Sequence, residues 1–142
     1  MNCRRFTPLL AAVLLLPAAA AAQQPGTCGG LTAGYEAWVS TGPAEAVRQW
    51  LQGSAIGSGE DLIAVLGQLQ GMFGAVTGHE IVRDVAVTPS FRRIYVLALH
   101  DAAPSYALFD CYRTGGRWTI TNINLNSDAE AILPPDVFWD GG

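Results

Sequence analysis

Asp110 is the residue whose type and setting could most directly do chemistry. It lies inside an alternating segment, 105–113, that predicts a strand, and strand interiors usually avoid Asp. In an apolar pocket its carboxyl group could act as a general base or acid, with a hydroxyl group from Tyr95 or Tyr112 beside it. The alternative, which the sequence favours, is a cross-strand hydrogen bond to Thr121 or to a tyrosine hydroxyl group. We therefore assign no catalytic residue and keep Asp110, Tyr95 and Tyr112 as candidates only.

Two asparagines, Asn122 and Asn124, occupy alternate positions of the next predicted strand. Their amide groups could orient the polar head of a ligand, although such side chains more often hydrogen-bond a neighbouring strand or a loop. Aromatic side chains could supply the apolar wall of the same pocket, or could simply form the core. The candidate ligand-binding residues are Trp50, Phe73, Tyr106, Phe109, Trp118, Asn122 and Asn124.

The two histidines, His79 and His100, have no companion at the spacing of a metal site, so we expect neither a metal ion nor another cofactor. His100 adjoins a turn and should be solvated, and His79 should belong to a loop before the first strand. The sequence contains no recognisable Ser-His-Asp set, phosphate-binding loop or catalytic carboxylate pair. These observations favour binding over catalysis.

The first residues have the pattern of a secretory signal peptide. Arg4 and Arg5 form a basic start, residues 9–16 a short apolar core, and small residues lead to Ala22. We expect residues 1–22 to be removed, residues 23–30 to form an N-terminal arm, and residues 31–142 to form one domain. No later segment is long enough to span a membrane. The mature chain should therefore be exported by a bacterium, either to the periplasm or out of the cell.

Without Arg4 and Arg5 the chain holds six arginines, no lysine and twelve acidic residues, which gives a net charge of about −6. This charge argues against nucleic acids and anionic membranes as partners. Cys3 would leave with the signal peptide, so Cys28 and Cys111 remain. An even pair in an exported protein favours a disulfide; one buried and one mobile thiol is the alternative.

The spacing of apolar residues changes once along the chain. The segments 31–40, 43–53 and 59–74 have the periodicity of helices. The segments 79–89, 92–100, 105–113 and 117–125 alternate as strands do, with short turns between them. Helices followed by strands predict an α+β domain in which N-terminal helices pack on a curved, four-stranded antiparallel meander.

The turn at residues 115–116 sets the register of the last two strands. It places Asn122 beside Phe109 on one face, and Asp110 near Tyr95 on the other. A one-residue bulge would change some of these positions. Both faces carry apolar residues, so we expect helices to cover one face and a partner subunit, the N-terminal arm or a ligand to cover the other.

The order of helices and meander, ending in "RWTITNINLNSDAEAILP", resembles exported bacterial members of the NTF2-like (cystatin-like, α+β cone) superfamily. The segments "YEAWVSTGPAEAVRQWLQGSAI", "LGQLQGMFG" and "GHEIV" follow the same order. The resemblance implies a sheet curled around the long helix, a conical pocket, and a homodimer formed through the outer sheet face. It implies no specific activity, because the superfamily contains ketosteroid-isomerase-like and dehydratase-like enzymes as well as binding modules.

We therefore expect an exported, non-enzymatic domain that binds a small apolar molecule or a protein partner. Its pocket would lie between the long helix and the meander. One alternative is a cofactor-free isomerase or lyase of the ketosteroid-isomerase type that uses Asp110 with a tyrosine. Another is a structural dimer whose cone is filled by its own side chains.

Overall fold

The computed structural model describes residues 28–139. The predicted signal peptide (1–22), most of the N-terminal arm (23–27) and residues 140–142 lie outside the described residues. Three helices come first, α1 (Leu31–Ser40), α2 (Pro43–Trp50) and α3 (Glu60–Phe73). Four strands follow, β1 (Val76–Thr88), β2 (Phe91–His100), β3 (Ser105–Thr114) and β4 (Arg117–Asn126), and then a 3₁₀ helix, η1 (Pro135–Phe138). The predicted α+β order is confirmed.

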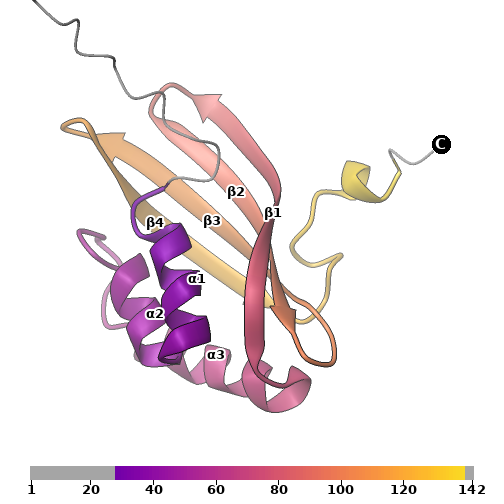
Figure 1. The fold of residues 1–142 in the computed structure, drawn as a ribbon. Coiled ribbons are helices and arrows are strands. Elements are labelled where there is room, and N and C mark those ends of the chain that lie inside the picture. Colours follow the sequence, from indigo (N-terminus) through magenta and orange to yellow (C-terminus); the bar gives the residue numbers. More distant parts are fainter. Residues whose placement is uncertain (1–27, 140–142) are drawn as a thin grey trace, which may run out of the picture.

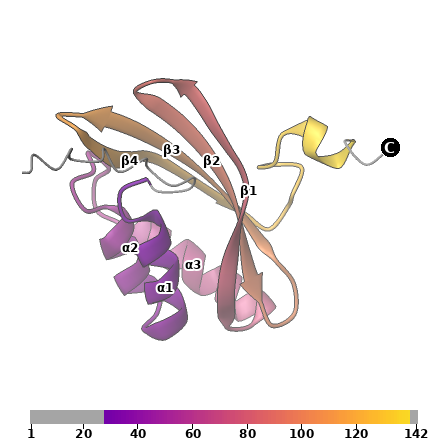
Figure 2. The ribbon, with the colours of Figure 1, turned by 45° about the horizontal axis from the view of Figure 1, so that its top comes forward.

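The four strands form one antiparallel sheet in chain order, β1-β2-β3-β4. The three helices lie against one face of this sheet, and the C-terminal segment returns along the opposite side (Figure 1 and Figure 2). We call these two sides the helix face and the outer face. The predicted packing of helices on a four-stranded meander is therefore correct.

The side chains of β2 alternate as the sequence predicts. Ile94, Val96 and Ala98 are buried on the helix face, whereas Tyr95 and Leu97 are half-buried on the outer face. Ladder pairing with β3 is regular along its whole length, without a bulge. The faces of these two central strands could therefore be counted directly from the period of two.

The predicted register of β4 is wrong beyond Ile120. Cys111 faces Ile120 as expected, but the next pair along the ladder is Asp110 with Asn122. Thr121 is therefore an extra residue, which makes a β-bulge in β4. Such a bulge moves every later side chain of the strand to the other face of the sheet.

The bulge reverses the predicted positions of the two asparagines. Ile123 faces Phe109 across the ladder, and Ile123 and Leu125 pack against the core on the helix face. Asn122 and Asn124 consequently lie exposed on the outer face. The side-chain amide of Asn122 donates to Asp110 on that face, and the residue also borders a small surface cavity beside Ile56 and Leu62 at the edge of the sheet.

Aromatic side chains fill the space between the helices and the sheet. Trp50, Tyr35 and Phe109 are all 0% exposed. The ring centroid of Tyr35 lies 5.1 Å from that of Trp50 and 6.0 Å from that of Phe109. Trp50 Nε1 donates a hydrogen bond of 3.0 Å to the carbonyl oxygen of Leu31. This packing requires Gly34 in α1, because an added Cβ atom there would lie 2.0 Å from Trp50 Nε1.

Cys28 and Cys111 pair as predicted. Their sulfur atoms lie at bonding distance, their Cα atoms are 6.0 Å apart, and both residues are fully buried. The bridge joins the residue Cys28, just before α1, to β3. The two cysteines are 83 positions apart in the sequence. It therefore holds the N-terminal end of the helical layer directly against the centre of the sheet.

Candidate functional site

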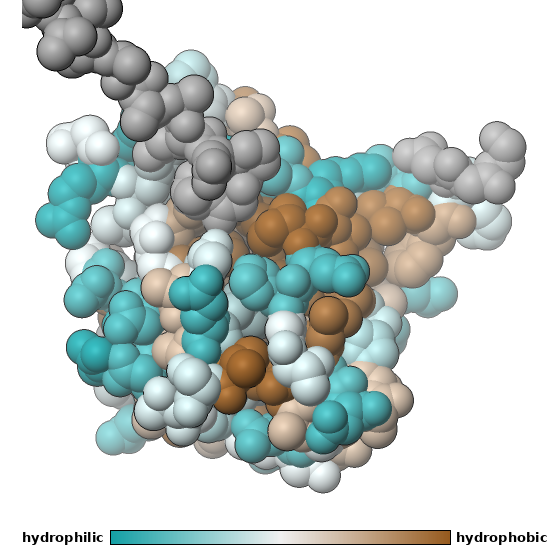
Figure 3. Space-filling view, in the orientation of Figure 1, coloured by the Kyte–Doolittle hydropathy of each residue, from teal (hydrophilic) through white to brown (hydrophobic). Residues whose placement is uncertain are grey.

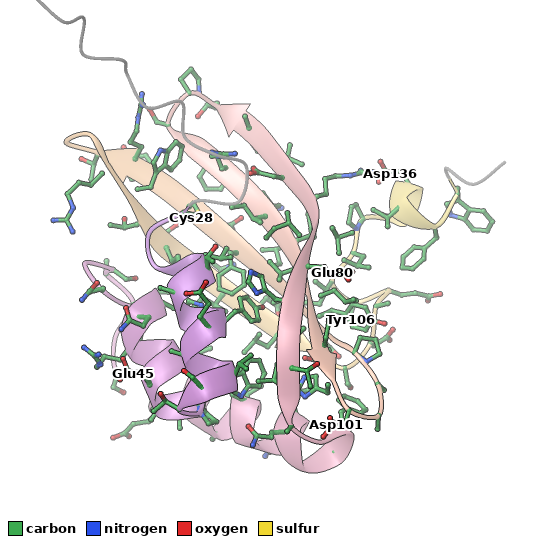
Figure 4. All side chains as sticks on the ribbon, in the orientation of Figure 1. Cys28, Glu45, Glu80, Asp101, Tyr106 and Asp136 are labelled. Atoms are coloured by element: carbon green, nitrogen blue, oxygen red, sulfur yellow. A yellow bond between two sulfur atoms is a disulfide. The ribbon has the colours of Figure 1, made fainter. Side chains whose placement is uncertain are left out.

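The predicted ligand-binding residues do not meet in one pocket. Trp50 and Phe109 are fully buried in the core, whereas Tyr106 is half-buried on the outer face (Figure 4). Phe73 lies at the end of α3, with its ring centroid 5.9 Å from that of His100. Together with the displaced asparagines, the candidates are divided between the interior and the opposite side of the sheet.

Trp118 is half-buried: it packs against the edge of the core and also borders a surface cavity. The sequence places Arg113 beside Trp118 at the hairpin end as a cation–π pair, and the guanidinium groups of Arg113 and Arg92 each lie 5.7 Å from the centroid of the Trp118 ring. The cavity measures about 460 Å³ and lies where the α1 N-terminus, the end of α2 and the β3–β4 turn meet. Besides Trp118, the residues that line it are Gly29, Gly30, Ala33, Gln49, Gln52, Gly116 and Arg117. Its amide and guanidinium groups do not suit an apolar ligand.

His79 lies on β1 and not in a loop, and it stacks on Tyr35. The two ring centroids are 4.6 Å apart and the ring planes are inclined by 12°. The Tyr35 hydroxyl group is buried and has no hydrogen-bond partner among the described residues. Burial raises the pKa of Tyr35 well above its ordinary value, so this phenol remains protonated and uncharged at any physiological pH.

Protonation of His79 should destabilise the fold in mild acid. Burial lowers the pKa of His79, and the charge of Glu36 opposes this effect only in part. The imidazole of His79 binds a proton more readily in the unfolded chain than in the folded one. The contribution of neutral His79 to the free energy of unfolding is therefore fully present above the unfolded pKa of 6.5. It is lost as the pH drops through the lower pKa of the folded state. Urea denaturation between pH 7 and pH 5 should show a falling free energy of unfolding.

A His79→Gln variant is the matched control, because it cannot titrate in this range. Its free energy of unfolding should change less between pH 7 and pH 5 than that of the natural protein. Parallel curves for the two proteins would contradict the assignment of the acid sensitivity to His79.

His100 is buried, contrary to the prediction that it is solvated. It is 9% exposed, its Nε2 atom lies 2.9 Å from Ser105 Oγ, and its Nδ1 atom lies 3.0 Å from the carbonyl oxygen of Gly74. A Ser–His hydrogen bond is one element of a nucleophilic site. Here, however, Ser105 is only 2% exposed, so a substrate has no access to its hydroxyl group. The pair connects the α3–β1 turn to the β2–β3 hairpin, which is a structural role.

Asp110 lies on the outer face and binds Arg93 instead of a tyrosine. The Nε and Nη2 atoms of Arg93 donate to the two carboxylate oxygens at 2.7 and 3.0 Å, and Asn122 Nδ2 donates at 3.3 Å. The hydrogen bond to Asp110 raises the pKa of the Arg93 guanidinium group, and Tyr95 adds a smaller contribution. Tyr112 is 47% exposed. A carboxylate held in this two-pronged way is a structural acceptor and is poorly placed to act as a base.

Replacing Asp110 by Ala should cost a modest amount of stability. Arg93 remains 42% exposed on its side chain, so water can replace the lost acceptor. We expect the free energy of unfolding to fall by about 1.5–2 kcal/mol, the low end of the range of about 1.5–3 kcal/mol for hydrogen bonds to a charged group. Urea denaturation of the natural protein and the variant measures this difference.

Asp136→Ala is the matched control, because the side chain of Asp136, which pairs with Arg83, is 59% exposed against 11% for that of Asp110. Its loss of stability should be smaller than that of Asp110→Ala. A loss well above 3 kcal/mol for Asp110→Ala would instead indicate a buried network left without partners.

The sequence analysis missed an exposed aromatic pair at the C-terminal end. Phe138 is 47% exposed and Trp139 is 81% exposed. They line a groove of about 270 Å³ together with Glu130, Leu133 and Pro135. We call these five residues the C-terminal patch. Figure 3 shows hydrophobic surface extending from the region of β1 toward the C-terminal segment.

An ion pair fixes the C-terminal patch beside the sheet. Asp136 of η1, which Figure 4 labels, pairs with Arg83 of β1. Ile132 and Leu133 are only 5% and 8% exposed, so the chain segment before η1 is packed against the rest of the protein. The sequence did contain a signal for this patch. Two adjacent aromatic residues follow two prolines, and because a central strand does not contain prolines, these aromatic residues lie outside the sheet.

Within residues 28–139, His, Cys, Asp and Glu side chains form no group of three that could hold a metal ion. No helix of the same part of the chain is long and apolar enough to cross a membrane. Comparison of the chain with protein-family models, with curated proteins and with solved structures finds no match.

Proposed function

We propose that the chain is an exported, non-enzymatic domain of NTF2-like type that binds a protein partner through the C-terminal patch. The observation that carries this proposal is the exposure of Trp139, 81%, next to the half-exposed ring of Phe138. Large aromatic residues are enriched in the centres of protein interfaces, where they supply much of the binding energy. A small exported domain has no structural need to keep two such rings in water.

A protein partner is better supported than an apolar small molecule. The cone that would hold such a molecule contains the fully buried side chains of Trp50, Tyr35 and Phe109. The groove at the patch, about 270 Å³, is slightly below the usual size of a small-molecule site, which starts at about 300 Å³. Its volume suits one or two side chains of a partner.

The isomerase or lyase alternative has less support. It needs a carboxyl group in an apolar pocket, next to a tyrosine hydroxyl group that can hold an oxyanion. Asp110 instead faces away from the helices and holds Arg93 and Asn122. The structural-dimer alternative agrees with the filled cone, but it leaves the exposed Trp139 without a role.

Photo-crosslinking in the native host tests the proposal. A photoreactive amino acid replaces Trp139 in one strain and Val39 in another, because Val39 is also apolar and is 46% exposed, but lies on α1. We expect a crosslinked protein adduct of defined mass from position 139 and none from position 39. Native mass spectrometry of the purified protein should show no added small molecule.

Equal adducts from both positions would indicate unspecific contact and contradict the proposal. A reproducible small-molecule mass without any adduct from position 139 would move the assignment to a ligand-binding domain. Cys28 and Cys111 support the exported setting of this test, since buried disulfides form in oxidising compartments.

A further inference from the structure

The C-terminal patch combines one carboxylate with two aromatic rings. Glu130 shares the groove of about 270 Å³ with Phe138 and Trp139, and the rest of the lining is apolar. The backbone N–H group of Glu130 donates to Asp128, but the Glu130 carboxylate makes no hydrogen bond or ion pair within residues 28–139. A carboxylate that borders an aromatic groove without a partner from its own chain can accept hydrogen bonds from a ligand of opposite charge.

The surroundings of the groove are acidic. The segment 127–139 contains Asp128, Glu130 and Asp136, and it contains no Lys, Arg or His. Arg83 of β1 does contact this segment, but its positive charge is matched there by the carboxylate of Asp136. The chain after the predicted signal peptide is also acidic as a whole, with six arginines against twelve acidic residues. A negative field attracts cations, so charge complementarity favours a basic occupant for the groove.

This inference rests on the function proposed above and specifies the partner. We propose that the groove of the C-terminal patch receives an arginine side chain of the partner protein. The plane of the guanidinium group stacks on the ring of Trp139, and its N–H groups donate to the carboxylate of Glu130. Of the aromatic side chains, tryptophan makes the strongest cation–π contact, and arginine is the cation that most often takes part.

Other occupants fit the groove less well. A purely apolar side chain would cover the Glu130 carboxylate without giving it a hydrogen bond, which costs free energy. An acidic side chain would meet a like charge. A lysine ammonium group is strongly hydrated and cannot stack on a ring through a flat face. The guanidinium group is planar and weakly hydrated, and it can donate two parallel hydrogen bonds to one carboxylate.

Two matched peptides test this chemistry on the mature, disulfide-bonded protein. In NMR spectra of the ¹⁵N-labelled protein, the indole N–H signal of Trp139 is identified by its loss in the Trp139→Leu variant. We expect acetyl-Gly-Arg-Gly-amide to shift this signal saturably, with a Kd in the millimolar range. The same peptide with citrulline in place of arginine has the same shape without the charge. It should bind at least about threefold more weakly.

Three variants identify the groups that hold the arginine peptide. Glu130→Gln removes the charge but keeps the shape of the side chain, so it should raise the Kd of the arginine peptide at least about threefold. Trp139→Leu, followed at the backbone amide of Phe138, should raise it about two- to fivefold. Glu60→Gln is the matched control, because it makes the same change of net charge on α3, across the sheet from the C-terminal segment (Figure 2), and should leave the Kd unchanged. The spectra also show whether each variant is folded.

The outcomes separate this inference from the function on which it rests. Equal binding of the two peptides, or an effect of Glu60→Gln as large as that of Glu130→Gln, overturns the arginine assignment. In the host, Glu130→Gln should reduce the crosslinked adduct from position 139. An adduct that Glu130→Gln does not reduce overturns this inference and leaves the protein-partner function in place. Selective binding of the arginine peptide without any adduct keeps the cation-binding groove and contradicts the protein partner.

Discussion

Removal of the Cys28–Cys111 bridge should lower the free energy of unfolding by about 4.5 kcal/mol, because the bridge closes a loop across 83 positions of sequence. The bond restricts the unfolded chain, and the entropy it removes grows with the length of the loop. Urea denaturation of the mature protein and of a Cys28→Ala/Cys111→Ala variant measures the difference. The midpoint should move to a much lower urea concentration.

Treatment with a reductant is the control for this experiment. The natural protein should lose a similar amount of stability once the bond is reduced, whereas the double variant should not respond. A double variant within about 1 kcal/mol of the oxidised protein would show that the unfolded chain is compact enough to make the bridge redundant.

The size of this effect bears on where the protein can work. Domains of this length have a total stability of about 5–15 kcal/mol, so the bridge would supply a third or more of it. Without the bond, the helical layer would depend on its contacts with the sheet and on the short loops between elements. A chain of this kind is suited to an oxidising compartment, in agreement with the proposed export.

The architecture could be predicted wherever the spacing of apolar residues stayed constant along a whole helix or strand. The alternation in β2 and β3 is unbroken, so the buried positions Ile94, Val96 and Phe109 follow from counting in steps of two. The glycine pair at residues 115–116, with φ values of 56° and 77°, makes the turn that its residue types indicate. The disulfide could be predicted because the signal peptide indicates an oxidising compartment and two cysteines remain after its removal.

The candidate site was less predictable because its register depends on one residue. The bulge at Thr121 has no distinctive residue type, and it moves Asn122 to the side of Asp110. The partner of the Asp110 carboxylate was missed: Arg93 lies directly across the ladder, whereas the predicted hydrogen bond from Thr121 forms at the backbone carbonyl oxygen of Asp110. A long side chain on the adjacent strand competes successfully with any hydroxyl group for a carboxylate.

Whether aromatic rings line a pocket or fill it depends on how closely the backbones approach. A small residue at one position can let a large ring take up all the available space. Gly34 has this effect here, because α1 passes so close to α2 that the indole of Trp50 lies against the Gly34 Cα atom. Composition and spacing alone do not specify such a contact.

Gly34→Ala should therefore destabilise the protein, although alanine normally favours a helix over glycine. The new Cβ atom would lie 2.0 Å from Trp50 Nε1 and 2.2 Å from its Cδ1 atom, so the indole must move. Movement would also break the hydrogen bond from Trp50 to Leu31. We expect a loss of about 3 kcal/mol in the free energy of unfolding, from overpacking together with the lost hydrogen bond. Thermal and urea denaturation both measure it.

Gly67→Ala is the matched control, because Gly67 is also inside a helix and an added Cβ atom there has no neighbour within 4 Å. It should stabilise the protein by up to about 1 kcal/mol. Opposite signs for the two variants would show that Trp50 is locked in place and that the space between the helices and the sheet has no spare volume. If Gly34→Ala were tolerated as well as Gly67→Ala, the indole could swing aside without cost. The interior could then open to admit a small molecule, and the apolar-ligand function would regain the support that the packed core now gives to a protein partner.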